Sequence, residues 1–149
     1  MKAQVNEIKI SYKDRIKSDK WIKINGSRSA ASFIYDYWDK DTIEAHESFK
    51  VLLLNNANKV KGIIEISKGG ITGTLVDLRL LIAVVLKSLS VAIILTHNHP
   101  SGTSKPSASD KAITQKIKTA AAFFDVKILD HIIITPNADY FSFADEGLL

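Results

Sequence analysis

Two histidines, a serine and an aspartate lie close together in the sequence and could form a metal site. His97 and His99 are separated by one residue, and Ser107 and Asp110 follow after a loop. Side chains alternate along an extended segment, so both imidazoles can reach one cation at the usual Zn–N distance of about 2 Å. Asp110 can supply a third ligand. Three protein ligands and an open fourth position for water are typical of a catalytic zinc site.

Such a site also needs a general base, and Glu47 is the candidate. It stands just before an apolar segment, on the same alternating face as Phe49 and Val51. A carboxylate at that strand end can meet the water at the metal. Glu44 and His46 lie beside it in a polar run that would ordinarily be solvated, so the residues alone leave both interpretations of Glu47 open.

Other polar residues near the motif have more ordinary interpretations. Ser107 followed three residues later by Asp110 is also a helix-capping pattern, and capping is compatible with metal binding. We expect His46 to be an exposed polar residue. His131, preceded by Asp130, is expected to be a hydrogen-bonded strand residue or to support the ligands from behind, rather than to be a fourth protein ligand.

The first half of the chain is expected to supply strands and one helix. Ile8, Ile10 and Tyr12 alternate with polar residues and predict an early strand, and residues 29–38 carry apolar side chains at helical spacing. Residues 49–55 and 60–66 are short and apolar, with a polar turn between them. They predict a β-hairpin.

The second half is expected to alternate helices with strands. The residues predicted to form the inner stripe of a helix over 78–89 are Leu78, Leu81, Ile82, Val85, Leu86 and Leu89. A continuous apolar run, 91–95, predicts a strand covered on both faces that ends at His97. A helix over 107–124 is expected to turn inward Ala112, Ile113, Ile117, Ala120 and Phe124. Strands over 126–135 and 140–143 complete a mixed α/β domain with its polar groups at one strand end.

Composition limits the chemistry further. The 149-residue chain is 46% hydrophobic, which suits one buried core. It has no cysteine, so any metal must bind to histidines and carboxylates. The formal net charge of +4 permits nucleic-acid contact without arguing for it. The charged opening segment and the short apolar runs predict a cytoplasmic protein with no membrane association.

The ordered set of motif residues resembles a known enzyme family. His97-x-His99 followed by Ser107 and Asp110, with Glu47 upstream, is similar to the motif of the JAB/MPN (JAMM) metallopeptidases. The surrounding sequence resembles the RadC-like branch of that family at His97-Asn98-His99-Pro100-Ser101-Gly102, Pro106-Ser107, Leu129-Asp130-His131 and Tyr140-Phe141-Ser142-Phe143. A chance match to the whole set is improbable compared with a match to one short motif.

The resemblance implies a fold, a cofactor and a reaction. The fold would be a cytidine-deaminase-like α/β/α arrangement, a mixed sheet flanked by helices. His97, His99 and Asp110 would bind one Zn²⁺, Glu47 would take and return the proton of the attacking water, and Ser107 would steady the tetrahedral oxyanion. Family enzymes with this site cleave peptide or isopeptide bonds, so a peptide or isopeptide is the expected substrate.

The resemblance also divides the chain. It covers residues 41–149, the predicted RadC-like JAB/MPN domain, and leaves residues 1–40 as an N-terminal extension of a strand plus a helix packed on the core. Typical RadC-like chains carry helix-hairpin-helix elements in their N-terminal region. Residues 1–40 do not resemble those elements, so the DNA-binding role of that region is not expected to transfer.

Two alternatives to catalysis remain. RadC-like chains carry a DNA-repair label, and the basic N-terminal half could follow a phosphate backbone, so a DNA-associated protein is one alternative. A noncatalytic interaction module of the same fold is the other, although every motif position is filled here. A zinc nucleobase deaminase is excluded because it needs paired cysteines.

Overall fold

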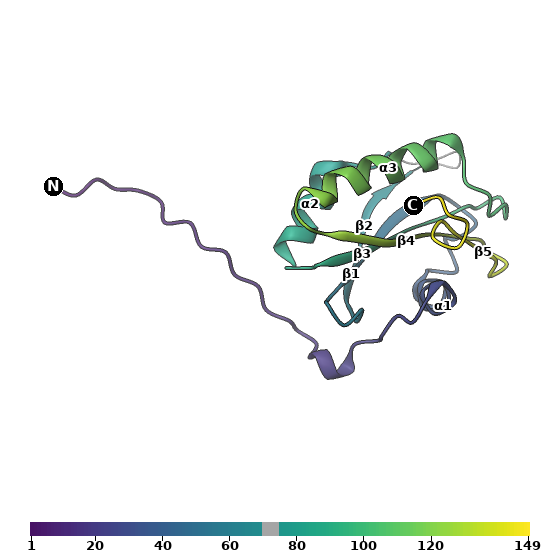
Figure 1. Cartoon of the computed structure of the whole chain (residues 1–149), viewed down its shortest axis with the longest axis horizontal. Helices are drawn as coiled ribbons and strands as arrows, with labels where there is room; N and C mark the ends of the chain where they lie inside the picture. The colour runs from purple at the N-terminus through teal and green to yellow at the C-terminus, as the bar shows by residue number, and fades with distance from the viewer. Residues whose placement is uncertain (70–74) are drawn as a thin grey trace.

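The computed structural model describes residues 1–69 and 75–149. Its centre is one five-stranded mixed sheet in the order β2-β1-β3-β4-β5. Helix α1 covers one face, and α2 and α3 cover the other (Figure 1). The elements are α1 (Ser27–Tyr37), β1 (Ser48–Leu54), β2 (Val60–Lys68), α2 (Leu78–Lys87), β3 (Ala92–Asn98), α3 (Ala108–Ala122), β4 (Lys127–Ile134) and β5 (Tyr140–Ser142). The predicted α/β/α fold is therefore present.

Strand pairing brings the two halves of the motif together. β1 pairs antiparallel with β2, as the predicted hairpin, and also with β3, where Phe49 lies opposite His97. β3 and β4 are parallel because α3 carries the chain back between them, as parallel strands require. The segment before β1 therefore lies at the same sheet edge as the end of β3.

Alternation along β3 divides its side chains between two cores. Ile93 and Leu95 pack with α2 and α3, whereas Ile94 packs with α1 on the opposite face. All seven residues of β3 are buried, as the continuous apolar run predicts. The same alternation continues past the apolar run, so His97 belongs to the α2/α3 face and Asn98 to the α1 face.

The early strand predicted from Ile8, Ile10 and Tyr12 is wrong. Residues 1–14 form neither strand nor helix, and Ile8 and Ile10 are 83% and 81% exposed. The segment leaves the domain as an extended arm (Figure 1). Alternating apolar residues stabilise a strand when a neighbouring strand pairs with them, and this arm has no strand partner among the described residues. The predicted helix nearby is present as α1.

The inner faces of α2 and α3 differ in part from the predicted stripes. Leu81 and Val85 are buried, but Leu86 is 42% exposed, and Leu89 lies beyond the end of α2 and is 60% exposed. In α3 the buried residues are Thr114, Ile117 and Ala121, whereas Ala112 is exposed, and Phe124 lies beyond the end of α3 and is 49% exposed. Thr114 can be buried on the inner face of α3 because internal hydrogen bonds satisfy its hydroxyl. No helix of residues 1–69 or 75–149 has the length and apolarity that a membrane crossing requires.

Candidate metal centre

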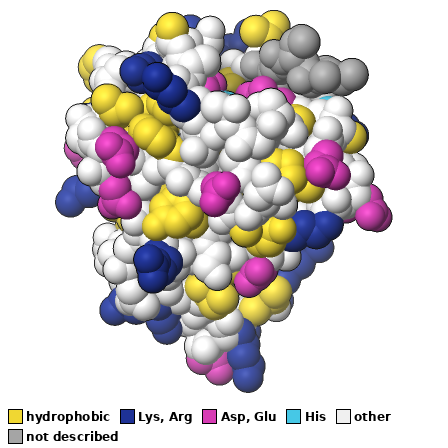
Figure 2. Space-filling model, turned by 90° about the vertical axis from the view of Figure 1, so that its right-hand side faces the viewer, with side chains coloured by type: hydrophobic (Ala, Val, Ile, Leu, Met, Phe, Trp, Pro, Cys, Tyr) yellow, Lys and Arg dark blue, Asp and Glu magenta, His cyan; other side chains and the backbone are white. Residues whose placement is uncertain are grey.

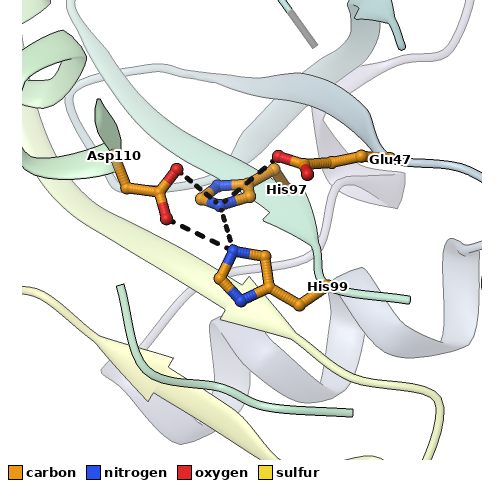
Figure 3. A group of neighbouring side chains, drawn as sticks. All are labelled: Glu47, His97, His99 and Asp110. Carbon is orange, nitrogen blue, oxygen red and sulfur yellow. Dashed lines mark hydrogen bonds and ion pairs between the residues drawn. The ribbon is translucent and has the colours of Figure 1, made fainter. Parts of the chain in front are cut away.

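Four side chains from three parts of the fold converge at the end of β3. Glu47, His97, His99 and Asp110 each offer one ligand atom, and these atoms lie within 4.8 Å of one another. His97 lies one residue before the end of β3, His99 follows β3, Asp110 comes from the first turn of α3, and Glu47 approaches from the segment before β1 (Figure 3). The structure thus brings together four of the five predicted site residues.

The spacing of the donor atoms fits a tetrahedral cation. Asp110 Oδ1 lies 3.2 Å from His97 Nε2, and Asp110 Oδ2 lies 3.3 Å from His99 Nε2. The two Nε2 atoms are 3.0 Å apart. Two ligand atoms that are each about 2 Å from a tetrahedral zinc ion are about 3.3 Å apart. These distances, two of which join the imidazoles to different oxygens of Asp110, are close to the spacing of ligand atoms around one ion.

The imidazole of His99 is oriented for metal binding by the loop that follows it. His99 Nδ1 donates a hydrogen bond to the main-chain carbonyl of Thr103, at 2.7 Å. A carbonyl can only accept, so the proton of the neutral ring is on Nδ1. The lone pair on Nε2 then faces Asp110 and His97, which is the arrangement that ligation requires.

Electrostatics keep Asp110 ionised. Burial alone would raise its pKa, but the adjacent imidazoles of His97 and His99 lower that pKa well below its usual range. Burial lowers the pKa of His99, and its hydrogen bonds with Asp110 and the Thr103 carbonyl outweigh this effect and leave it raised. A carboxylate that remains charged between two imidazoles is a suitable cation ligand.

Glu47 is held near the ligands by the backbone around it. Its Oε1 lies 3.9 Å from His97 Nε2, farther than Asp110, and its side chain is 16% exposed. The buried amide of Asn98 donates hydrogen bonds to the carbonyls of Ile43 (2.8 Å) and His46 (2.9 Å), and accepts one from the backbone N–H of Ser48 (2.8 Å). Asn98 therefore holds the backbone both before and after Glu47 by hydrogen bonds. The sequence did not predict this role.

Ser107 is the N-cap of α3. Its Oγ accepts from the backbone N–H of Asp110 (3.1 Å), and Asp110 Oδ2 accepts from the backbone N–H of Ser107 (2.8 Å). This reciprocal pair is the predicted capping box. It fixes the Asp110 side chain at the helix start, with Oδ1 and Oδ2 facing the histidines.

Two buried residues, His131 and Thr114, lie behind the ligands, and only Thr114 had no role predicted from the sequence. The Nε2 atom of His131, on β4, lies 2.8 Å from the Nδ1 atom of His97. Thr114, on α3, lies 2.6 Å from His131 Nδ1. The hydrogen-bonded role expected of His131 is present. The signal in the sequence that could have found Thr114 is its position one helical turn after Asp110.

The fold and this centre define a mixed α/β domain with a candidate His/His/Asp/Glu metal site, and comparison with known proteins places it in a family. The RadC-like JAB domain family matches residues 24–148. The chain belongs to this family. The match includes α1 as well as the motif residues, and the boundary drawn between residues 40 and 41 stays a prediction.

Relatives from several bacteria are similar to about two thirds of the chain. A UPF0758 protein of Flavobacterium johnsoniae is 56% identical over 103 residues, which are 69% of this chain and 44% of the relative. A UPF0758 protein of Porphyromonas gingivalis is 46% identical over 103 residues, covering 69% and 45% of the two chains. The matched region thus spans less than half the length of these curated relatives.

Proposed function

We propose that this protein is a zinc-dependent hydrolase that cleaves peptide or isopeptide bonds. The observation that supports the proposal most strongly is the spacing of His97, His99 and Asp110, which is that of three tetrahedral ligands, with the Glu47 carboxylate beside them. A structural site would normally use a fourth protein ligand at the same spacing. Glu47 lies farther from His97, which suits a base better than a ligand.

The donor set favours Zn²⁺ over the harder divalent cations. Imidazole nitrogens make up two of the three closely spaced donors, and tetrahedral spacing suits zinc. Mg²⁺ and Ca²⁺ prefer six or more oxygen ligands. We therefore propose that His97, His99 and Asp110 hold Zn²⁺.

The residues divide the chemistry among themselves. When bound, Zn²⁺ would supply a water of lowered pKa, about 7, and a Lewis acid for the carbonyl. Glu47 accepts the proton of the attacking water and returns it to the leaving amine, as general base and then general acid. Ser107 donates its hydroxyl hydrogen to the developing oxyanion, a contact typically worth on the order of 3 kcal/mol in the barrier.

Cleavage of peptide and isopeptide libraries by the zinc-loaded protein tests the proposal. Wild type is compared with Glu47→Gln, which removes the base, and with Glu44→Gln, which changes an exposed carboxylate of the same segment. We expect cleavage by wild type and Glu44→Gln, and a loss of at least about 100-fold in Glu47→Gln with zinc retained. Equal cleavage by all three proteins would reject Glu47 as the base, and cleavage by none would reject the hydrolase.

The face of the molecule in Figure 2 gives the DNA-associated alternative little support. Basic and acidic side chains are interspersed on the face seen in Figure 2 rather than gathered by sign. A phosphate backbone is bound by clustered Lys and Arg, and the binding weakens steeply with salt. Salt-dependent DNA binding that persists after zinc removal would favour this alternative over catalysis.

A further inference from the structure

His131 lies at the back of the candidate metal centre, where its ring is completely buried. It stacks on Phe143, with ring centroids 4.6 Å apart, and meets the edge of Phe49. Both of its ring nitrogens nevertheless have polar partners, His97 Nδ1 at 2.8 Å and the Thr114 hydroxyl at 2.6 Å. A ring buried among aromatic side chains is neutral, because burial disfavours its charged form. One of its nitrogens therefore donates and the other accepts.

The direction of these hydrogen bonds is set at the helix. The Thr114 hydroxyl donates to the main-chain carbonyl of Asp110 at 2.6 Å, the usual back-bond of a threonine to the residue four positions earlier. A carbonyl has no hydrogen to give, so the single hydroxyl hydrogen of Thr114 is used there. Thr114 Oγ1 must then accept from His131, which places the proton of His131 on Nδ1.

His131 in turn determines the tautomer of the metal ligand His97. With its proton on Nδ1, His131 has a lone pair on Nε2 and accepts from His97 Nδ1. The proton of neutral His97 is then on Nδ1, and its Nε2 is a free lone pair facing Asp110 and His99. The opposite direction would place a hydrogen on His97 Nε2, and that hydrogen would block ligation.

We infer that His131 is a positioning residue whose hydrogen bond to Thr114 fixes His97 in the tautomer that can bind a metal. The inference rests on the proposed zinc site and deepens it. Asp110 takes part twice, because its carboxylate lies among the ligands while its main-chain carbonyl sets the direction of the chain Asp110–Thr114–His131–His97. His99 needs no such chain, since the Thr103 carbonyl fixes its tautomer directly.

Ring-nitrogen NMR of the metal-free protein tests the direction itself. Long-range ¹H–¹⁵N spectra at about pH 8.5, well above the ordinary histidine pKa of about 6.5, distinguish the two tautomers. We expect the proton on Nδ1 in both His131 and His97 of the wild type. A His131 proton on Nε2 would overturn the inference. This readout does not depend on zinc binding, so it separates the inference from the proposed function.

Variants at Thr114 test the consequence for binding. Thr114→Val has nearly the same shape but offers His131 no acceptor, whereas Thr114→Ser keeps the hydroxyl. Thr119→Val is the matched control, because Thr119 is exposed on the same helix. By competition with a chromophoric chelator, we expect Thr114→Val to bind zinc about tenfold more weakly, and Thr114→Ser and Thr119→Val to match the wild type.

The tautomer should change together with the affinity. In Thr114→Val we expect a share of His131 with its proton on Nε2, a change that a loss of packing alone would not produce. His131→Phe, which keeps a ring between Phe49 and Phe143, should weaken zinc binding by at least as much as Thr114→Val. Unchanged zinc affinity in both variants, with metal-free folding intact by circular dichroism, would overturn the inference.

Discussion

The two sides of the candidate centre are built differently. His97, His99 and Asp110 come from one β3–α3 unit and are joined by side-chain contacts of 3.0–3.3 Å. Glu47 comes from the segment before β1 and is placed by backbone hydrogen bonds to Asn98, which lies on the opposite face of the sheet. The difference indicates that ligand geometry and base placement are set by separate contacts. Changes on one side should therefore affect metal affinity, and changes on the other should affect turnover.

The largest expected effect on the ligand side is that of Asp110→Asn. The amide keeps the size of the side chain but removes the charge that lies between the two imidazoles. We expect zinc affinity to fall by more than about 100-fold, beyond the 10–100-fold typical of a residue that acts through a ligand. Competition with a chelator measures the loss. A zinc affinity equal to that of the wild type would show that Asp110 does not contribute to metal binding.

Asn98→Ala is the corresponding change on the base side. It removes three hydrogen bonds from a fully buried amide, and leaving their partners unpaired should lower the free energy of unfolding by about 3 kcal/mol. We expect turnover of the folded, zinc-loaded variant to fall at least about tenfold as Glu47 loses its placement, with zinc affinity within about twofold of the wild type.

A matched control for Asn98→Ala is Asn55→Ala in the β1–β2 turn. Asn55 Oδ1 also accepts from two backbone N–H groups, those of Ala57 and Lys59, but it lies away from the centre. We expect the Asn55→Ala variant to have a lower free energy of unfolding than the wild type and the same turnover. If Asn98→Ala weakens zinc binding as strongly as turnover, the two sides are not separate.

Ser107→Ala has the smallest expected effect on stability. Losing an N-cap costs about 1 kcal/mol of unfolding free energy, which urea denaturation of the metal-free protein measures. Asp77→Ala removes the cap of α2, where Asp77 accepts from Arg79 and Leu80, and should cost a similar amount. We expect a loss of activity in Ser107→Ala alone. Equal activity in the two cap variants would assign Ser107 to capping and not to the oxyanion.

The sequence was most informative where function depends on local geometry. Alternation at the end of a buried strand placed His97 and His99 on one side, and the capping pattern placed Asp110 in the first turn of a helix. Both need only a few neighbouring residues. Glu47 needed the family resemblance, because its approach depends on the pairing of β1 with β3, distant segments whose register the residues themselves do not state.

The features that the sequence did not predict depend on long-range contacts. Thr114 looks like a surface residue until His131 is placed opposite it, and that placement follows from the parallel pairing of β3 with β4. The apolar alternation of Ile8 and Ile10 resembles that of a real strand, but a strand forms when another strand pairs with it. A local sequence pattern indicates which secondary structure a segment can form, and contacts with distant segments determine whether that structure forms.

Zinc content of the purified protein tests the central claim most directly. Elemental analysis after mild purification should find close to one zinc per wild-type chain, and almost none in His97→Ala. His46→Ala, which removes a histidine outside the ligand cluster, should retain the metal. A wild-type protein without zinc that also fails to bind it on titration, or a His97→Ala variant with unchanged zinc content, would contradict the assignment of this centre.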